Sequence, residues 1–162
     1  MKKWPKLTLV AHTRSHLIVS SLLSTGPSQD APLFEPAMLR ASWHLDTDRL
    51  LADGGYDSEA NHRLAREGLG IRSTVINLNR RGKGAGRKPS RRKWAKTRYR
   101  RQMYRRFHRR KYRQRWQAES VISRFKRRLG SALRSRSDAS RERESNVRVL
   151  THNLMILAGS SP

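Results

Sequence analysis

The sequence predicts an α/β protein, because short runs of strand-forming residues alternate with segments of helical spacing. The clearest observation lies in the middle of the chain, where two β-rich apolar runs, 49–52 and 71–77, flank a segment of helical spacing, 59–67. Two further β-rich runs precede this unit, and two segments of helical spacing follow it. The 162 residues are most simply one domain with a modest apolar core.

A β-hairpin is predicted at the start of the chain. The runs Leu7–Ala11 and Leu17–Leu23 are rich in strand-forming residues, and a short polar segment separates them. Turn-forming residues follow from Gly26 to Asp30. After this turn we expect a helix over 31–41, although Pro36 disfavours a regular helix there.

The middle of the chain is predicted to form a strand, a loop, a helix and a second strand. The first strand, Arg49–Ala52, ends in the segment Asp53–Ser58. Helical spacing then runs over Glu59–Glu67, and Ile71–Asn77 is the second strand. Asp53 therefore falls at the carboxyl end of a strand. Its alternative role is that of a turn or helix-capping residue, since Asp-Gly-Gly is a common turn sequence.

A dense basic tract follows this unit. From Arg80 to Arg128, 23 of 49 residues are Lys or Arg, and Glu119 is the one acid. Asn79–Arg92 contains three glycines, a proline and one apolar residue, so we expect a flexible basic loop there. Aromatic residues and methionine then interrupt the Arg/Lys run at mixed spacing as far as Tyr112, which predicts irregular helical turns.

Two helices are predicted at the end of the chain. The first ends at Gly130, and the last begins near Asp138 or Ser140 and stops at Gly159. We expect the last helix to bury one apolar stripe, made of Val147, Leu150, Leu154 and Leu157. The elements divide the chain into a sheet with helices, a basic insert and carboxyl-terminal helices, over residues 1–78, 79–111 and 112–162.

Charge and composition indicate a polyanionic partner. The net charge of +25 would oppose compaction of an isolated monomer, so we expect nucleic acid to neutralise it. The absence of cysteine excludes disulfides and Cys-ligated zinc. The apolar runs are too short or too interrupted to cross a membrane, so we expect a cytoplasmic, nucleoid-associated protein with no membrane partner.

Four residues recur at spacings that a helix would gather on adjoining faces, namely Tyr112, Arg115, Glu119 and Lys126. Arg115 and Glu119 are four residues apart, and Glu119 and Lys126 are seven apart. A single carboxylate among so many cations suits a metal ligand beside phosphate-binding groups. The alternatives are an intrahelical ion pair for Glu119 and a core aromatic for Tyr112.

The segment Ala52–Ser58, together with the spacing Tyr-x2-Arg-x3-Glu-x6-Lys, resembles the catalytic domain of bacterial insertion-sequence transposases of the DDE type. The amino-terminal hairpin and the last helix also resemble that family, so the resemblance covers most of the chain. It implies an RNase H-like mixed sheet with flanking helices. In that fold, carboxylates hold two divalent metal ions that activate water or a DNA 3′-hydroxyl.

The resemblance also implies roles for single residues. Asp53 and Glu119 would be catalytic acids and ligands of Mg²⁺ or Mn²⁺, and Tyr112, Arg115 and Lys126 match positions that contact or orient DNA phosphates. Further DNA contacts are expected from the basic tract, at Arg105, Arg106, Arg109 and Arg110. The family's first aspartate has no counterpart here. We therefore expect a fold that is incomplete at its amino terminus and inactive alone.

Three functions remain open at this point. The first is metal-dependent cleavage and transfer of DNA strands during transposition. The second is a DNA-binding module that pairs with a full-length transposase or with itself as a dimer. The third is a basic RNA-binding protein of ribosomal type, which composition alone would allow. The missing aspartate is the feature that distinguishes catalysis from DNA binding alone. The Tyr-Arg-Glu-Lys spacing distinguishes both of these functions from RNA binding.

Overall fold

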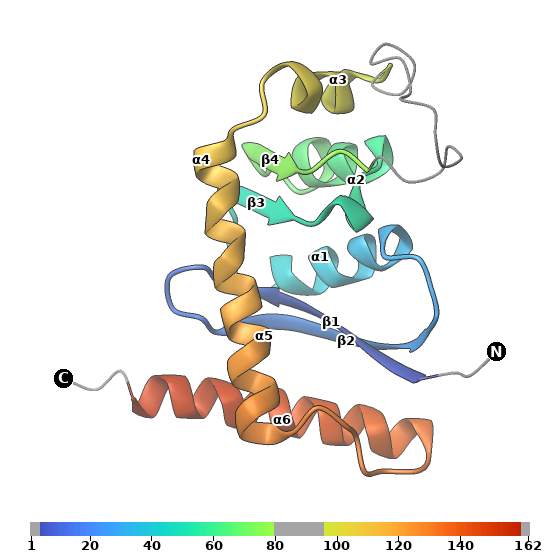
Figure 1. The fold of residues 1–162 in the computed structure, drawn as a ribbon, viewed down its shortest axis with the longest axis vertical. Helices are drawn as coiled ribbons and strands as arrows, with labels where there is room; N and C mark the ends of the chain where they lie inside the picture. Colours follow the sequence, from blue (N-terminus) through green and yellow to red (C-terminus); the bar gives the residue numbers. More distant parts are fainter. Residues whose placement is uncertain (1–3, 80–95, 160–162) are drawn as a thin grey trace, which may run out of the picture. The chain divides into compact units, whose positions relative to one another are not determined.

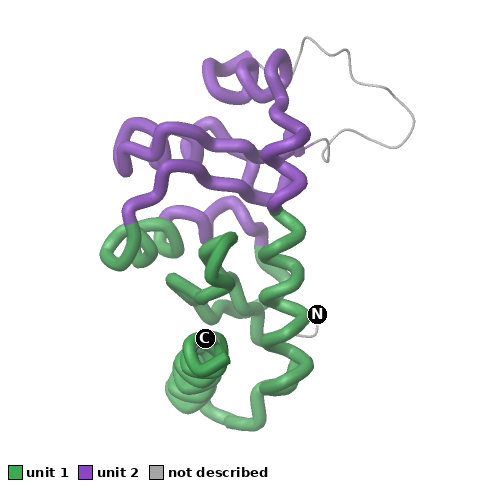
Figure 2. Tube along the Cα trace, turned by 90° about the vertical axis from the view of Figure 1, so that its left-hand side faces the viewer, with its two compact units in different colours: residues 1–28, 36–45, 115–162 green, residues 29–35, 46–114 purple. Residues whose placement is uncertain are grey.

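A computed structural model describes residues 4–79 and 96–159, which belong to two compact units (Figures 1 and 2). Unit 1 comprises residues 1–28, 36–45 and 115–162, and unit 2 comprises residues 29–35 and 46–114. Each unit combines two β-strands with helices, so the predicted α/β class is confirmed. No helix in the described ranges is both long enough and apolar enough to span a membrane.

Unit 1 is built on an antiparallel hairpin, which confirms the first predicted element. Strand β1 (Trp4–Ala11) pairs with β2 (Ile18–Gly26), with Leu7 opposite Leu23 and an irregularity between Val10 and Ala11. Ile18 packs in an apolar cluster with Val121 and Phe125. This hairpin is the surface on which the helices of unit 1 are arranged.

The helix after the hairpin differs at its start from the prediction. Residues Ala31–Leu33 form a 3₁₀ turn (η1), and α1 proper is Phe34–Ser42. Asp30 makes no side-chain capping hydrogen bond. Within unit 1, the carbonyl of Ala37 accepts a hydrogen bond of 2.8 Å from the Ser20 hydroxyl, which joins α1 to β2.

The two predicted carboxyl-terminal helices are confirmed. Helix α5 (Trp116–Leu129) ends at Gly130, whose φ of 86° suits a residue without a Cβ. Helix α6 (Asp138–Ala158) is capped by Ser137, whose hydroxyl accepts from the amide of Ser140. Val121 and Phe125 of α5 are buried in the apolar cluster of unit 1.

The predicted buried stripe of α6 is wrong. Its four residues are 55–61% exposed, and the buried residues of this helix are Ser145 and His152. The inward face of this helix instead supplies hydrogen bonds to the start of β2. Asn153 bonds both the amide and the carbonyl of Ile18, and the His152 ring packs against Phe125 and donates from Nε2 to the carbonyl of His16 at 3.2 Å. The face of α6 that carries Val149, His152 and Asn153 therefore lies against the hairpin.

Unit 2 is built on the predicted strand-loop-helix-strand sequence. Strands β3 (Arg49–Ala52) and β4 (Ser73–Ile76) are parallel, and α2 (Glu59–Arg63) lies between them in sequence. The hydroxyl of Ser58 caps α2, and a π-helical turn (η3, Leu64–Gly68) extends it. A parallel pair needs such a crossover, so this part of the prediction is confirmed.

The basic tract forms short helices where the structure describes it. Helices α3 (Arg98–Arg105) and α4 (Arg109–Tyr112) are followed by a 3₁₀ turn (η4, Arg113–Arg115) that leads into α5. These elements are the expected irregular helical turns. The loop expected over 79–92 lies outside the described residues from 80 onward. The three-part division of the chain stays a prediction.

Candidate nucleic-acid interface

Asp53 directly follows β3 and caps a short 3₁₀ turn (η2, Gly54–Tyr56). Its exposed carboxylate accepts a hydrogen bond of 2.7 Å from the amide of Gly54. A Cβ on Gly54 would lie 3.2 Å from the carbonyl oxygen of Asn77, so the loop after β3 passes close to the residue that follows β4. The capping role considered for Asp53 is thus present, and the carboxylate also faces solvent at the carboxyl edge of the parallel strands.

Glu119 lies in the first turn of α5 and forms an ion pair with Arg115. The distance from Arg115 Nη2 to Glu119 Oε1 is 2.7 Å, and the Glu119 side chain is 60% exposed. This is the i, i+4 pair that the spacing allowed as an alternative. Exposed pairs of this kind contribute roughly 0–1 kcal/mol to stability, so the contact does little to hold the fold.

Glu119 also lines a shallow depression on α5 that the sequence analysis missed. Its other lining residues recur three and four positions apart along one helical face, and they are Trp116, Ser120, Ser123, Arg124 and Arg127. Lys126 is exposed in the last turn of the same helix. The exposed face of α5 therefore presents an indole, hydroxyls and cations near the Glu119 carboxylate.

Tyr112 ends α4 in unit 2, and its half-buried ring packs against Phe107. The two ring centroids are 5.0 Å apart at an interplanar angle of 56°. Tilted aromatic pairs of this geometry stabilise a fold by roughly 0.5–1.5 kcal/mol beyond area burial. Tyr112 is therefore partly a packing residue, as its alternative interpretation required.

The four arginines expected to contact DNA lie at the end of α3 and in α4, and all four are exposed: Arg105, Arg106, Arg109 and Arg110. None of the ion pairs within the described ranges involves them. Their guanidinium groups are therefore available to a ligand. A planar guanidinium suits phosphate, because it donates two parallel hydrogen bonds.

Three carboxylates hold α3 on unit 2, and we call this group the α3 anchor: Asp57, Glu59 and Glu67. The Asp57 side chain is fully buried and accepts from Arg100 Nη2 at 2.9 Å. Glu59 accepts from the backbone amides of Tyr99 and Arg100 at the start of α3, at 3.0–3.2 Å. Glu67 accepts from the Tyr99 hydroxyl at 2.8 Å.

The pKa shifts of the residues in the α3 anchor agree with these contacts. Partial burial would raise the pKa of Glu59, but hydrogen bonds from the Thr97 side chain and from two backbone amides lower it below its usual value. The hydrogen bond from Tyr99 is the main cause of a lowered pKa for Glu67, and the same bond raises the pKa of Tyr99. One feature of the sequence pointed to the α3 anchor, namely that acidic residues are scarce in this basic chain.

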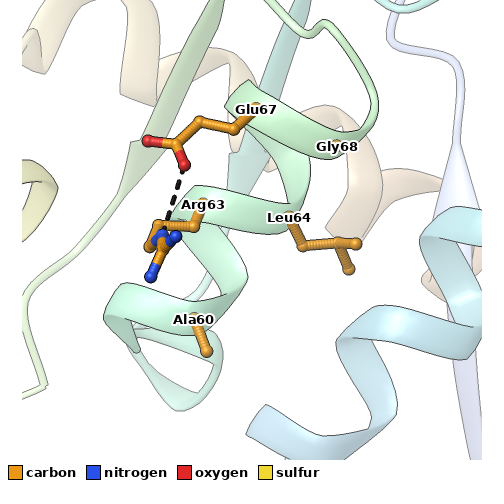
Figure 3. Close-up of a pocket in the computed structure, with 5 residues that line it drawn as sticks. All are labelled: Ala60, Arg63, Leu64, Glu67 and Gly68. Carbon is orange, nitrogen blue, oxygen red and sulfur yellow. Dashed lines mark hydrogen bonds and ion pairs between the residues drawn. The ribbon is translucent and has the colours of Figure 1, made fainter.

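Figure 3 shows a second shallow depression, on α2 and η3, that belongs to the same region. Arg63 and Glu67 face one another there, with Nε and Oε2 3.2 Å apart. Ala60 and Leu64 provide the apolar part of its lining. Since its charges are paired and Glu67 also binds Tyr99, this depression is part of the attachment of α3.

The described residues contain no ready cluster of metal-binding side chains. Within residues 4–79 and 96–159, His, Asp and Glu form no group of three or more that could hold an ion. Asp53 belongs to unit 2, whereas Glu119 belongs to unit 1 and is paired with Arg115. Their assignment as metal ligands stays a prediction.

A family model described as a transposase DDE domain matches residues 2–154. No curated protein and no solved structure matches the chain. The matched range contains every motif residue from Asp53 to Lys126, together with both strand pairs.

Proposed function

Because the chain belongs to the transposase DDE-domain family, we propose that it binds DNA during transposition through the exposed arginines of α3 and α4. Transposases act on DNA, and DNA transposition and recombination follow from the family. The family match does not support a basic RNA-binding protein of ribosomal type. Our proposal extends to an RNase H-like arrangement of the sheet and to action on the nucleoid in the cytoplasm.

The observation that carries this proposal is the set of exposed arginines outside the ion pairs of the described residues. Clustered guanidinium groups bind phosphates and release condensed counterions, a contribution that is largely independent of base sequence. Two acids of unit 2, Asp57 and Glu59, are engaged in the α3 anchor, where they bind Arg100 and the start of α3. Arg105 thus lies on a helix that these contacts hold in place, and the charges of all four arginines stay available to DNA.

We further propose that Tyr112, Arg115 and Lys126 contribute contacts to the DNA backbone. Lys126 is exposed on α5, and the Arg115 guanidinium is directed by its ion pair with Glu119. Phosphate can compete for Arg115, because an exposed ion pair is weak. The depression beside Glu119 adds hydroxyl donors from Ser120 and Ser123.

Catalysis by this chain alone is not part of the proposal. DDE transposase domains generally use divalent metal ions, which the sequence analysis expected to be Mg²⁺ or Mn²⁺. Asp53 and Glu119 remain the proposed acids, but the described residues form no group of three metal-binding side chains. We therefore propose that strand transfer requires a further carboxylate, in addition to those of Asp53 and Glu119.

The DNA-binding proposal is tested by a salt titration of binding to a DNA duplex. Replacing Arg105, Arg106, Arg109 and Arg110 by alanine should reduce the slope of log affinity against log salt by about 3 to 4. The matched control removes four exposed arginines outside the tract, Arg14, Arg40, Arg136 and Arg143, with the same loss of charge. Equal slopes for both variants would show that binding depends on net charge, and the proposal would be wrong.

The catalytic proposal is tested with DNA that carries insertion-sequence ends, in Mg²⁺ or Mn²⁺. We expect no nicking by the isolated chain. The variant Glu119→Gln is the control, because it keeps the side-chain shape and removes the charge. Nicking by the unmodified chain that this substitution abolishes would show that Glu119 works in a complete site, and would contradict the proposal.

A further inference from the structure

His16, in the turn of the β1–β2 hairpin, has a backbone conformation that side chains rarely adopt. Its φ is 62°, and among the described residues it alone, apart from glycine, has a positive φ. Backbone contacts hold it on both sides, because its amide donates to the carbonyl of His12 at 2.9 Å and its carbonyl accepts from His152 at 3.2 Å. Strained residues that their surroundings hold in place are found preferentially at functional sites.

The imidazole of His16 reaches the start of α5. His16 Nε2 lies 2.6 Å from Oε1 of Gln117, which is 101 positions away in the sequence. A carbonyl oxygen can only accept a hydrogen bond, so Nε2 carries the proton and donates. Both side chains are partly buried, and both residues belong to unit 1. The turn of the hairpin is thereby joined to α5 through a side chain.

Gln117 lies in the first turn of α5, on the face that packs against the hairpin. Val121 and Phe125 follow it at intervals of four residues, and both are buried in the apolar cluster with Ile18. The start of α5 has no cap of its own, because its N-cap residue, Arg115, makes no side-chain capping hydrogen bond. The bond from His16 thus ties an uncapped helix start to the hairpin.

The rotation of α5 about its axis decides where its outward side chains point. Successive helical residues are turned by about 100°, so Arg115 and Glu119, each two positions from Gln117, lie roughly 160° away from it around the axis. They form the ion pair of 2.7 Å, and the Glu119 side chain is 60% exposed. Holding Gln117 against the hairpin therefore directs this pair to the opposite, outward side.

We propose that His16 is a positioning residue, which acts through Gln117 to hold the first turn of α5 in the rotation that presents Arg115 and Glu119 to DNA. The proposal rests on the proposed function of this face of α5. The turn alone would be better served by glycine, which adopts a positive φ without strain. The contact of the imidazole with α5 explains why a histidine occupies this position.

The variant His16→Gly separates the side chain from the turn, because glycine suits the backbone conformation and removes only the imidazole. We expect its affinity for a DNA duplex at fixed salt to fall about three- to tenfold, since a charge-assisted contact loses its orientation. Gln117→Ala should cause the same loss, and the double variant should lose no more. His44→Gly is the matched control, because it removes an exposed imidazole from the same unit, and it should bind like the unmodified chain.

The variant Arg115→Gln tests whether the effect of His16 passes through α5. It should weaken DNA binding by itself, and adding His16→Gly to it should cause no further loss. A residue that only stabilised the fold would weaken binding in both backgrounds. The proposal would be overturned by a further loss in this background, or by a His16→Gly chain that binds normally although Arg115→Gln does not.

Hydrogen exchange tests the positioning without DNA. The backbone amides of Glu119 and Ser120 should exchange faster in His16→Gly and in Gln117→Ala, whereas the amide of Leu150 on α6 should be unaffected. Unchanged exchange at the start of α5 would overturn the proposal even if the chain binds DNA as proposed. Faster exchange there, with no effect of Arg115→Gln on DNA affinity, would support the positioning of α5 and contradict the proposed DNA contact of Arg115.

Discussion

The side-chain amide of Asn153 on α6 completes the backbone hydrogen bonding of Ile18 at the start of β2. Oδ1 of Asn153 accepts from the Ile18 amide at 2.8 Å, and Nδ2 donates to the Ile18 carbonyl at 2.9 Å. Asn153 thus does for this residue what a neighbouring strand would do. Because Ile18 is buried, no solvent is available to replace these bonds.

Replacing Asn153 by alanine should therefore destabilise unit 1. The variant leaves a buried donor and a buried acceptor unsatisfied, and we expect a loss of about 2 kcal/mol or more in the free energy of unfolding. Urea denaturation measures this loss, and faster hydrogen exchange of the Ile18 amide would locate it. Asn146→Ala, at an exposed position of the same helix, should have almost no effect. Similar stabilities of the two variants would contradict this account of α6.

Removing Arg100 should detach α3 from unit 2. The Asp57 carboxylate is fully buried and would lose its charged partner in Arg100→Gln, which costs about 3 kcal/mol or more for such pairs. We expect earlier unfolding in urea and faster proteolysis within α3. Arg101→Gln is the neighbouring control, since Arg101 is exposed and bonds the carbonyl of Lys96. If both variants resisted protease equally, the α3 anchor would not hold the helix.

Glu144 should make the stability of unit 1 depend on acid. Hydrogen bonds from the backbone amides of Ser135 and Arg134 and from the Ser135 side chain, followed by the charge of Arg148, lower the pKa of Glu144 to about 2. A lowered carboxyl pKa contributes stability that is complete above the unfolded value near 4.5 and is lost as the pH falls through about 2. Thermal unfolding between pH 5 and pH 2 should show a smaller acid loss in Glu144→Gln than in the unmodified chain. Glu142→Gln, on an exposed residue, should behave like the unmodified chain.

His62 should make unit 2 less stable in weak acid. Burial lowers its pKa, and this effect outweighs the nearby Asp57, which would raise it. The folded ring therefore stays neutral while the unfolded ring takes up a proton below about pH 6.5, so stability falls as the pH drops through that region. The ring Nδ1 is 2.8 Å from the Thr74 hydroxyl. NMR titration should show that His62 protonates below pH 6.5, the ordinary value for histidine, and protonation at or above that value would contradict the assignment.

The local elements could be predicted from the sequence, because strand and helix periods and capping residues are local signals. The β3-α2-β4 unit and the Gly130 end of α5 are examples. The orientation of α6 could not be predicted in this way. A 3.6-residue period identifies an apolar face but does not say whether that face packs against the hairpin. In the structure the face that carries Asn153 packs there, and Asn153 forms hydrogen bonds with the backbone of Ile18.

The candidate site could be predicted less completely. The spacing of Arg115 and Glu119 predicted their proximity, which the 2.7 Å ion pair confirms. The α3 anchor joins Asp57 to Arg100 across 43 positions, and sequence spacing alone carries no signal for a contact of that range. The scarcity of acids pointed to Glu119, whereas buried Asp57 is the more constrained carboxylate.

The α3 anchor joins two parts of the chain that are well separated in sequence. Asp57 and Glu59 lie before residue 80, and the helix they hold begins after residue 95. The position of α3 is therefore set by contacts at its own residues. A peptide tag inserted between residues 80 and 95 would therefore leave the contacts of the α3 anchor intact. A single cut in that stretch would yield two pieces that remain associated.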